Sequence, residues 1–183
     1  MSNLPKKCVV DTNVPITANL ATNPAAIPDE LAPCVLECVK SVEHVIKNGG
    51  LVLDAGGEIF AEYHGCGIHR GHLSLQGQPG VGDQFVKWVH DHQWNPSHCD
   101  RIAITKKGDS YDEFPHHDGL SQFDNSDRKF IAVANAHQGK PPVLQATDSK
   151  WWGWKDALEE MGITVRFVCP EYARQKHKEK MGA

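Results

Sequence analysis

Residues 7–13 read KCVVDTN, a short apolar and β-branched run that ends in an acidic residue. Such a run favours a buried strand, and Asp11, Thr12 and Asn13 are residues that stop a strand and begin a loop. The stretch therefore predicts a buried first strand with a carboxylate at its C-terminal end.

The rest of the chain alternates predicted strands with predicted helices. Strands are expected at 51–54, 101–105, 142–147 and 163–168, and helices at 29–47, 57–65, 83–92, 127–137 and 154–162. These strands are apolar throughout, which favours a parallel sheet covered by helices on both faces. We therefore expect an α/β fold, a three-layer α/β/α sandwich with a central, mostly parallel sheet.

Length and composition fit one domain. The chain has 183 residues, of which 40% are hydrophobic and 23% are charged, enough to bury a core. We expect a single domain over 1–183 with its core at about 7–168. Polar inserts are expected at about 64–82 and 106–123, and a charged C-terminal tail at 170–183.

The net charge, the absence of targeting signals and the cysteine spacing indicate which surface, location and thiol state to expect. The net charge of −4 and the pI near 6.2 argue against a broad basic surface that coats nucleic acid. No signal peptide or membrane span is seen, so we expect a cytoplasmic location and no membrane partner. The six cysteines form no C-x-x-C pair, and we expect free, buried thiols.

The acidic residues carry the functional signal. Asp11 and Asp148 are expected at strand ends, where ligands of parallel sheets collect, and Asp127 is expected in the first turn of a helix. Glu58 and Glu62 lie one turn apart on the helix after the second strand. One such acid is explained by a turn or a helix cap. A set of them repels itself unless a hard divalent cation neutralises it.

The expected cation is Mg²⁺ or Mn²⁺, because both bind carboxylate and water oxygens and keep positions open for a phosphate. Such an ion lowers the pKa of a bound water, and a second ion stabilises the leaving oxygen at phosphorus. The chemistry that follows is hydrolysis of a phosphodiester bond.

Four motifs together resemble the PIN-domain nucleases: VVDTNV (9–14), GEIFAEY (57–63), DNSDRKFIAVANA (124–136) and ATDSKW (146–151). The resemblance covers about residues 7–168 and implies a metal-dependent nuclease that acts mostly on RNA. It implies that the catalytic and metal-binding residues are Asp11, Glu62, Asp127 and Asp148.

Within this resemblance, some assignments stay open. Asn13 resembles the polar residue that supports the first acid, and Glu62 is favoured over Glu58 because it precedes an aromatic residue. Asp124 is either a further ligand or a helix cap.

The sequence also suggests a substrate and partners. Lys150 and Arg128 are candidates for contacts with the RNA phosphates, and RNA is favoured over DNA. A toxin–antitoxin or phage-defence setting is the expected context. An antitoxin, a defence-system protein and a second copy of the chain in a homodimer all stay open as partners.

Other features have local explanations. Histidines 64, 69, 72, 90, 92 and 98 with Cys99 match no standard zinc finger, so we favour solvated or locally hydrogen-bonded rings. Trp151, Trp152 and Trp154 serve either base stacking or core packing.

Two other functions are alternatives to the nuclease. A catalytically inactive PIN-like scaffold would bind nucleic acid or a protein partner on the same fold. A phosphatase with an aspartyl nucleophile is disfavoured, because it needs a second acid two residues after the first and Asn13 stands there.

Overall fold

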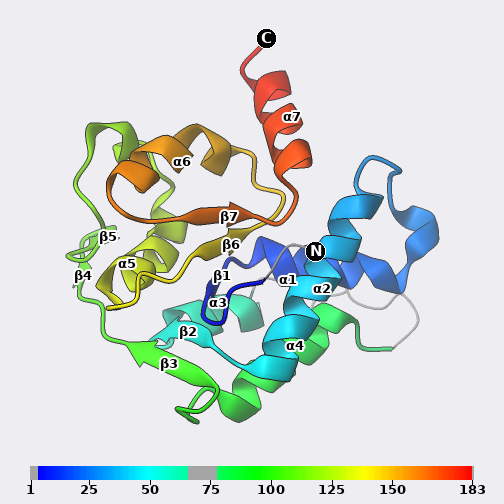
Figure 1. Cartoon of the computed structure of the whole chain (residues 1–183), viewed down its shortest axis with the longest axis horizontal. Coiled ribbons are helices and arrows are strands. Elements are labelled where there is room, and N and C mark those ends of the chain that lie inside the picture. The colour runs from blue at the N-terminus through cyan, green and yellow to red at the C-terminus, as the bar shows by residue number, and fades with distance from the viewer. Residues whose placement is uncertain (1–3, 66–77, 183) are drawn as a thin grey trace.

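A three-stranded and a two-stranded parallel sheet organise the molecule, with helices around them (Figure 1). The computed structural model describes residues 4–65 and 78–182. Its strands are β1 (Val9–Val10), β2 (Leu51–Asp54), β3 (Cys99–Ile102), β4 (Lys106–Lys107), β5 (Ser110–Tyr111), β6 (Val143–Gln145) and β7 (Val165–Phe167). The strands β1, β6 and β7 pair in parallel, and so do β2 and β3.

Strand β1 lies at the centre. Cys8, just before β1, bridges in parallel to Leu51 of β2, so the two sheets adjoin in the order β3-β2-β1-β6-β7. Both residues of β1 are buried, as expected for a strand with neighbours on both sides in a covered parallel sheet. The strands β4 and β5 form a separate antiparallel hairpin. The expected α/β class with a parallel sheet is confirmed.

Helices surround these strands. They are α1 (Asn13–Asn19), α2 (Ala32–Asn48), α3 (Glu58–Gly65), α4 (Val81–His92), α5 (Arg128–Ala136), α6 (Lys150–Glu160) and α7 (Pro170–Lys180). Short 3-10 turns occur at Leu20–Thr22, Pro24–Ala26, Asp118–Leu120 and Asn125–Asp127. Helices α1, α2 and α4 pack on one another, α5 contacts β1, β2 and β6, and α6 contacts β7 and α7. Within the described residues, no helix combines the length and the apolar character that a membrane span needs.

The start of α3 shows how a strand end fixes the next helix. The buried carboxylate of Asp54, the last residue of β2, accepts hydrogen bonds of 2.8 Å from the backbone N–H groups of Glu58 and Ile59. These donors would otherwise lack a partner at the helix N-terminus. Asp54 therefore sets the start of α3 and, with it, the direction in which Glu58 and Glu62 project.

The segment after Asp11 is a helix, and the predicted loop there is wrong. Helix α1 begins at Asn13, whose backbone N–H donates to Asp11 Oδ1 at 2.9 Å. Pro15 is tolerated because it lies in the first turn, where its missing N–H costs no helical hydrogen bond.

Three element boundaries differ from the sequence prediction. Strand β3 spans Cys99–Ile102 rather than 101–105, and α6 starts at Lys150 rather than at 154. Strand β6 ends at Gln145, so Asp148 lies in the turn before α6 and not at a strand end. Element ends depend on tertiary contacts and are the least certain part of a sequence pattern.

Two segments, which were predicted to be a polar insert and a charged tail, pack into the molecule. The insert at 106–123 contains β4 and β5, and it buries four large side chains, which are Tyr111, Phe114, Leu120 and Phe123. The tail forms α7, which buries Ala173 and contacts α6. Most of the insert at 64–82 lies outside the described residues.

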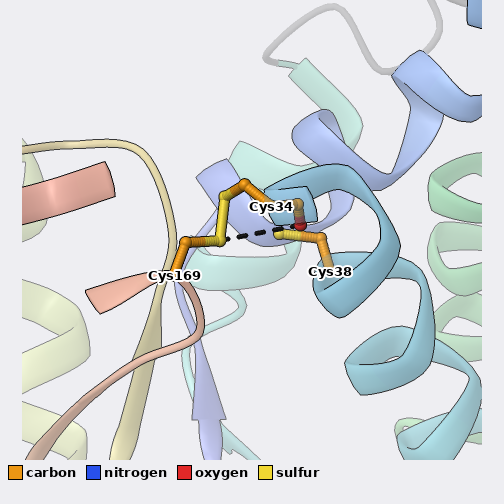
Figure 2. Close-up of side chains that lie close together, drawn as sticks. All are labelled: Cys34, Cys38 and Cys169. Atoms are coloured by element: carbon orange, nitrogen blue, oxygen red, sulfur yellow. Dashed lines mark hydrogen bonds between the residues drawn. A yellow bond between two sulfur atoms is a disulfide. The ribbon is translucent and has the colours of Figure 1, made fainter. Parts of the chain in front are cut away.

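The expectation of free thiols is wrong for one pair. Cys34 of α2 and Cys169, the residue before α7, form a disulfide across 135 positions (Figure 2). The fold brings the first turn of α2 beside the start of α7, which no sequence spacing reveals. Cys8, Cys38 and Cys99 are free and buried, as predicted, and Cys66 lies outside the described residues.

Candidate active site

Asp11 lies at the carboxyl end of β1, where the charges of Asp127 and Glu62 act on it. Its side chain is buried, and its backbone N–H donates to the carbonyl of Leu144 at 2.9 Å. Its Oδ1 accepts from the backbone N–H of Asn13 at 2.9 Å and from Gln145 Nε2 at 3.2 Å. Strand pairing and two donors thus fix the position of this carboxylate.

The electrostatic environment of Asp11 is strongly negative. Burial raises its pKa from 3.8 to about 8, and the charges of Asp127 and Glu62 add to the effect. The pKa of Asp127 is also raised, first by burial and then by the charges of Asp148 and Glu62. Asp11, Glu62, Asp127 and Asp148, here called the acidic cluster, therefore repel one another at one place.

Glu62 joins this cluster from α3. Thr12, the residue after Asp11, donates its hydroxyl proton to Glu62 Oε1 at 2.6 Å. Lys129 of α5 forms an ion pair with the other oxygen of Glu62, and its side chain is only 9% exposed. Glu62 thus has a fixed orientation and a buried countercharge.

Glu58 has different partners. Its Oε2 accepts a short hydrogen bond from the Tyr111 hydroxyl and lies 3.7 Å from Lys106 Nζ. The charge of Glu58 is not among those that raise the pKa of Asp11 or of Asp127. Of the two glutamates on α3, the structure brings Glu62 to the cluster.

Two acids of the cluster lie close to a further acid, Asp124, and all three are partly exposed. Carboxylate oxygens of Asp124, Asp127 and Asp148 lie within 4.8 Å of one another. Asp124 accepts from Lys150 Nζ at 2.7 Å. Asp124 stands at the N-cap position of the 3-10 turn Asn125–Asp127, but its side chain makes no capping hydrogen bond.

Three further residues, which were not among the predicted site residues, hold the cluster. Gln145 connects two acids, because its amide donates to Asp11 and its Oε1 accepts from the backbone N–H of Asp148 at 3.2 Å. Trp151 Nε1 donates to Asp127 Oδ2 at 3.1 Å, and Lys129 pairs with Glu62. The signal for Gln145 was a polar residue at the end of an otherwise apolar strand.

The predicted phosphate-binding residues lie near the cluster but have protein partners. Lys150 is half-exposed and pairs with Asp124. Arg128 donates to the carbonyl of Phe123 at 3.2 and 3.3 Å, and its guanidinium lies 4.8 Å from the centre of the Phe114 ring. Of the two, Lys150 has the more accessible charge.

The aromatic and histidine residues have local roles. Trp151 is fully buried, which confirms core packing for one of the three tryptophans. His90 bonds to Asp91 at 3.0 Å, and His92 bonds to the carbonyl of Trp88 at 2.8 Å, as expected for locally bonded rings. His69 and His72 lie outside the described residues.

Comparison of the chain with family models, with curated proteins and with solved structures gave no match.

Proposed function

We propose that this chain is a metal-dependent nuclease with one PIN-like domain, a three-layer α/β/α sandwich, and that it hydrolyses phosphodiester bonds in RNA. The observation that carries the proposal is the mutual repulsion of Asp11, Glu62, Asp127 and Asp148. A fold that gathers four acids and raises the pKa of a buried one to about 8 is less stable than it would be without them. A bound cation offsets that cost.

The donor atoms fit Mg²⁺ or Mn²⁺. All of the cluster's acidic ligands are carboxylate oxygens, which hard divalent cations prefer. When bound, such an ion would neutralise negative charge at the phosphate and lower the pKa of a bound water. Asp11, Glu62, Asp127 and Asp148 would hold the ion, and Asp124, whose oxygen lies within 4.8 Å of those of Asp127 and Asp148, would be a further ligand.

The neighbouring residues support the ligands. Gln145 and Asn13 hold Asp11, Thr12 holds Glu62, and Trp151 holds Asp127. Partners of this kind orient ligands and commonly change metal affinity about 10- to 100-fold when they are removed. The cluster is therefore organised as ligands with supporting donors rather than as scattered surface acids.

A pocket formed by the β4–β5 hairpin, the segment after it and the start of α5 offers a place for a nucleotide. It has a volume of about 500 Å³ and is lined by Lys107, Tyr111, His116 and Arg128, among others. Arg128 directly follows Asp127 in sequence, although none of the four acids lines the pocket. Cationic and aromatic side chains are the groups that bind phosphates and unpaired bases.

The decisive test compares Asp11→Asn with the wild-type chain. We expect the variant to keep its circular dichroism spectrum but to lose Mn²⁺ binding in calorimetry and cleavage of labelled transfer RNA and messenger RNA. Asp91→Asn, a change at an exposed acid on α4, is the matched control and should retain both activities. Single-stranded DNA serves as the competing substrate.

Two outcomes would contradict the proposal. Cleavage that persists in a chelator would rule out the metal-dependent mechanism. The absence of any saturable Mn²⁺ binding by the wild-type chain would favour the inactive scaffold.

A further inference from the structure

A second group of potential ligands lies away from the acidic cluster. Cys34, Cys38 and Cys169 are buried, and their sulfur atoms lie within 4.8 Å of one another. Figure 2 shows the Cys38 side chain beside the Cys34–Cys169 disulfide. Cys34 and Cys38 are four residues apart on α2 and therefore share one face of the helix. Cys169 is the residue before α7.

We propose that, when this disulfide is reduced, the three cysteines bind one Zn²⁺ ion through their thiolates. A dithiol or phosphine reductant breaks the S–S bond and leaves thiols on Cys34 and Cys169. The ion then forms three Zn–S bonds, and three protons are released to solvent. The disulfide and the zinc site are alternative states of the same three residues.

The spacing of the sulfur atoms fits this ligand set. Thiolates in a tetrahedral zinc site lie about 3.8 Å apart, which follows from a Zn–S distance of about 2.3 Å. The Cys38 sulfur already lies within 4.8 Å of the sulfurs of Cys34 and Cys169. Breaking the S–S bond allows Cys34 and Cys169 to move apart, toward the spacing that the ion needs.

The surroundings of the cysteines favour an ion with one open position. Cys169 is the residue before α7, and the positive end of a helix stabilises a thiolate there. A pocket of about 360 Å³ is lined by Cys34 and Cys169, so both a reductant and a fourth ligand can reach the sulfurs. The carboxylates of Glu30 and Glu37 in that pocket pair with lysines, which leaves water as the fourth ligand.

The experiment titrates Co²⁺, a spectroscopic substitute for Zn²⁺, into the full chain under anaerobic conditions. The chain is first reduced with a phosphine, which is then removed. We expect one equivalent of Co²⁺ to produce a thiolate-to-cobalt charge-transfer band that Zn²⁺ abolishes. The oxidised chain should not produce the band, and this comparison requires no substitution.

Two variants locate the site. Cys38→Ser should lose the band, whereas Cys99→Ser, a change at a buried free cysteine on β3, should keep it. Carboxylate-bound Co²⁺ gives no such band, so Asp11→Asn should leave it intact whether or not the proposed nuclease function holds. A reduced wild-type chain without the band, or a Cys38→Ser chain with an unchanged band, would overturn the zinc site.

Discussion

At the scale of single residues, Asp11 shows how the chemistry of a side chain depends on its neighbours. In sequence it is one aspartate after two valines, which a turn explains equally well. In the structure it is buried beside Asp127 and Glu62, and its pKa is raised to about 8. Its position is thus unfavourable for the free carboxylate, which makes the residue sensitive to both pH and cations.

The raised pKa of Asp11 predicts how stability changes with pH in the absence of metal. Between pH 3.8 and about 8 the folded chain keeps a proton on Asp11 that the unfolded chain has lost. Raising the pH through this range therefore lowers the free energy of unfolding, by at most about 1.4 kcal/mol per pH unit from this residue. Urea unfolding in a chelator at several pH values measures the slope.

Asp11→Asn is the control for this pH dependence, because an amide does not titrate. The variant should have a shallower slope and should be the more stable chain near the top of the range. Equal slopes in the two proteins would show that Asp11 is not the responsible group.

Lys129 is the internal countercharge of the cluster. Its side chain is 9% exposed and pairs with Glu62, so Lys129→Gln leaves a largely buried carboxylate without its cation. We expect the free energy of unfolding to fall by roughly 1 to 3 kcal/mol in a chelator, a range below that of fully buried pairs because Glu62 is 19% exposed. The loss should be smaller in saturating Mn²⁺, which supplies the missing charge.

A matched change separates this effect from the loss of any lysine. Lys106 pairs with Glu58 at 3.7 Å and is 65% exposed, so Lys106→Gln should change stability by less than about 1 kcal/mol. A loss in Lys129→Gln that is the same with and without Mn²⁺ would argue against a bound cation near Glu62.

At the scale of elements, strand β6 both pairs in the sheet and holds two of the acids in place. Its last residue, Gln145, links Asp11 to the turn that carries Asp148. We expect Gln145→Leu to fold, because a buried apolar residue suits the end of this strand, but to weaken Mn²⁺ binding about 10- to 100-fold. Calorimetric titration measures the change in affinity.

Gln93→Leu provides the control for Gln145→Leu. Gln93 is also a buried glutamine, but it follows α4 and accepts from Arg101 at 3.1 Å. This variant should bind Mn²⁺ with wild-type affinity. A similar loss of affinity in both variants would mean that general destabilisation, and not the orientation of Asp11, causes the effect.

At the scale of the whole molecule, the Cys34–Cys169 disulfide ties α2 to α7 across 135 positions. Closing so long a loop restricts the unfolded chain, and such bonds typically contribute roughly 2 to 5 kcal/mol. We therefore expect urea unfolding of the oxidised chain to have a higher midpoint than that of the reduced chain. Cys34→Ala should match the reduced chain with or without a reductant, and a wild-type midpoint that does not respond to the reductant would contradict the expectation.

Much of the fold was accessible from the sequence because its signals are local. The apolar run before Asp11 predicted β1, and the periodic apolar residues of α2 predicted a helix that ends before Gly49. The apolar strands predicted a parallel sheet. The loop predicted after Asp11 failed because Asn13 and Pro15 act as turn residues in isolation, whereas here they begin α1.

The sequence by itself determined the order of strands and helices and the presence of four acids at motif positions, because strand and helix periodicity are properties of neighbouring residues. Only the tertiary structure decided that Glu62 rather than Glu58 joins Asp11, that Gln145 and Lys129 support the acids, and that Cys34 meets Cys169. These facts depend on the directions in which distant elements approach one another. Such directions follow from packing the whole core, which no short window of sequence contains.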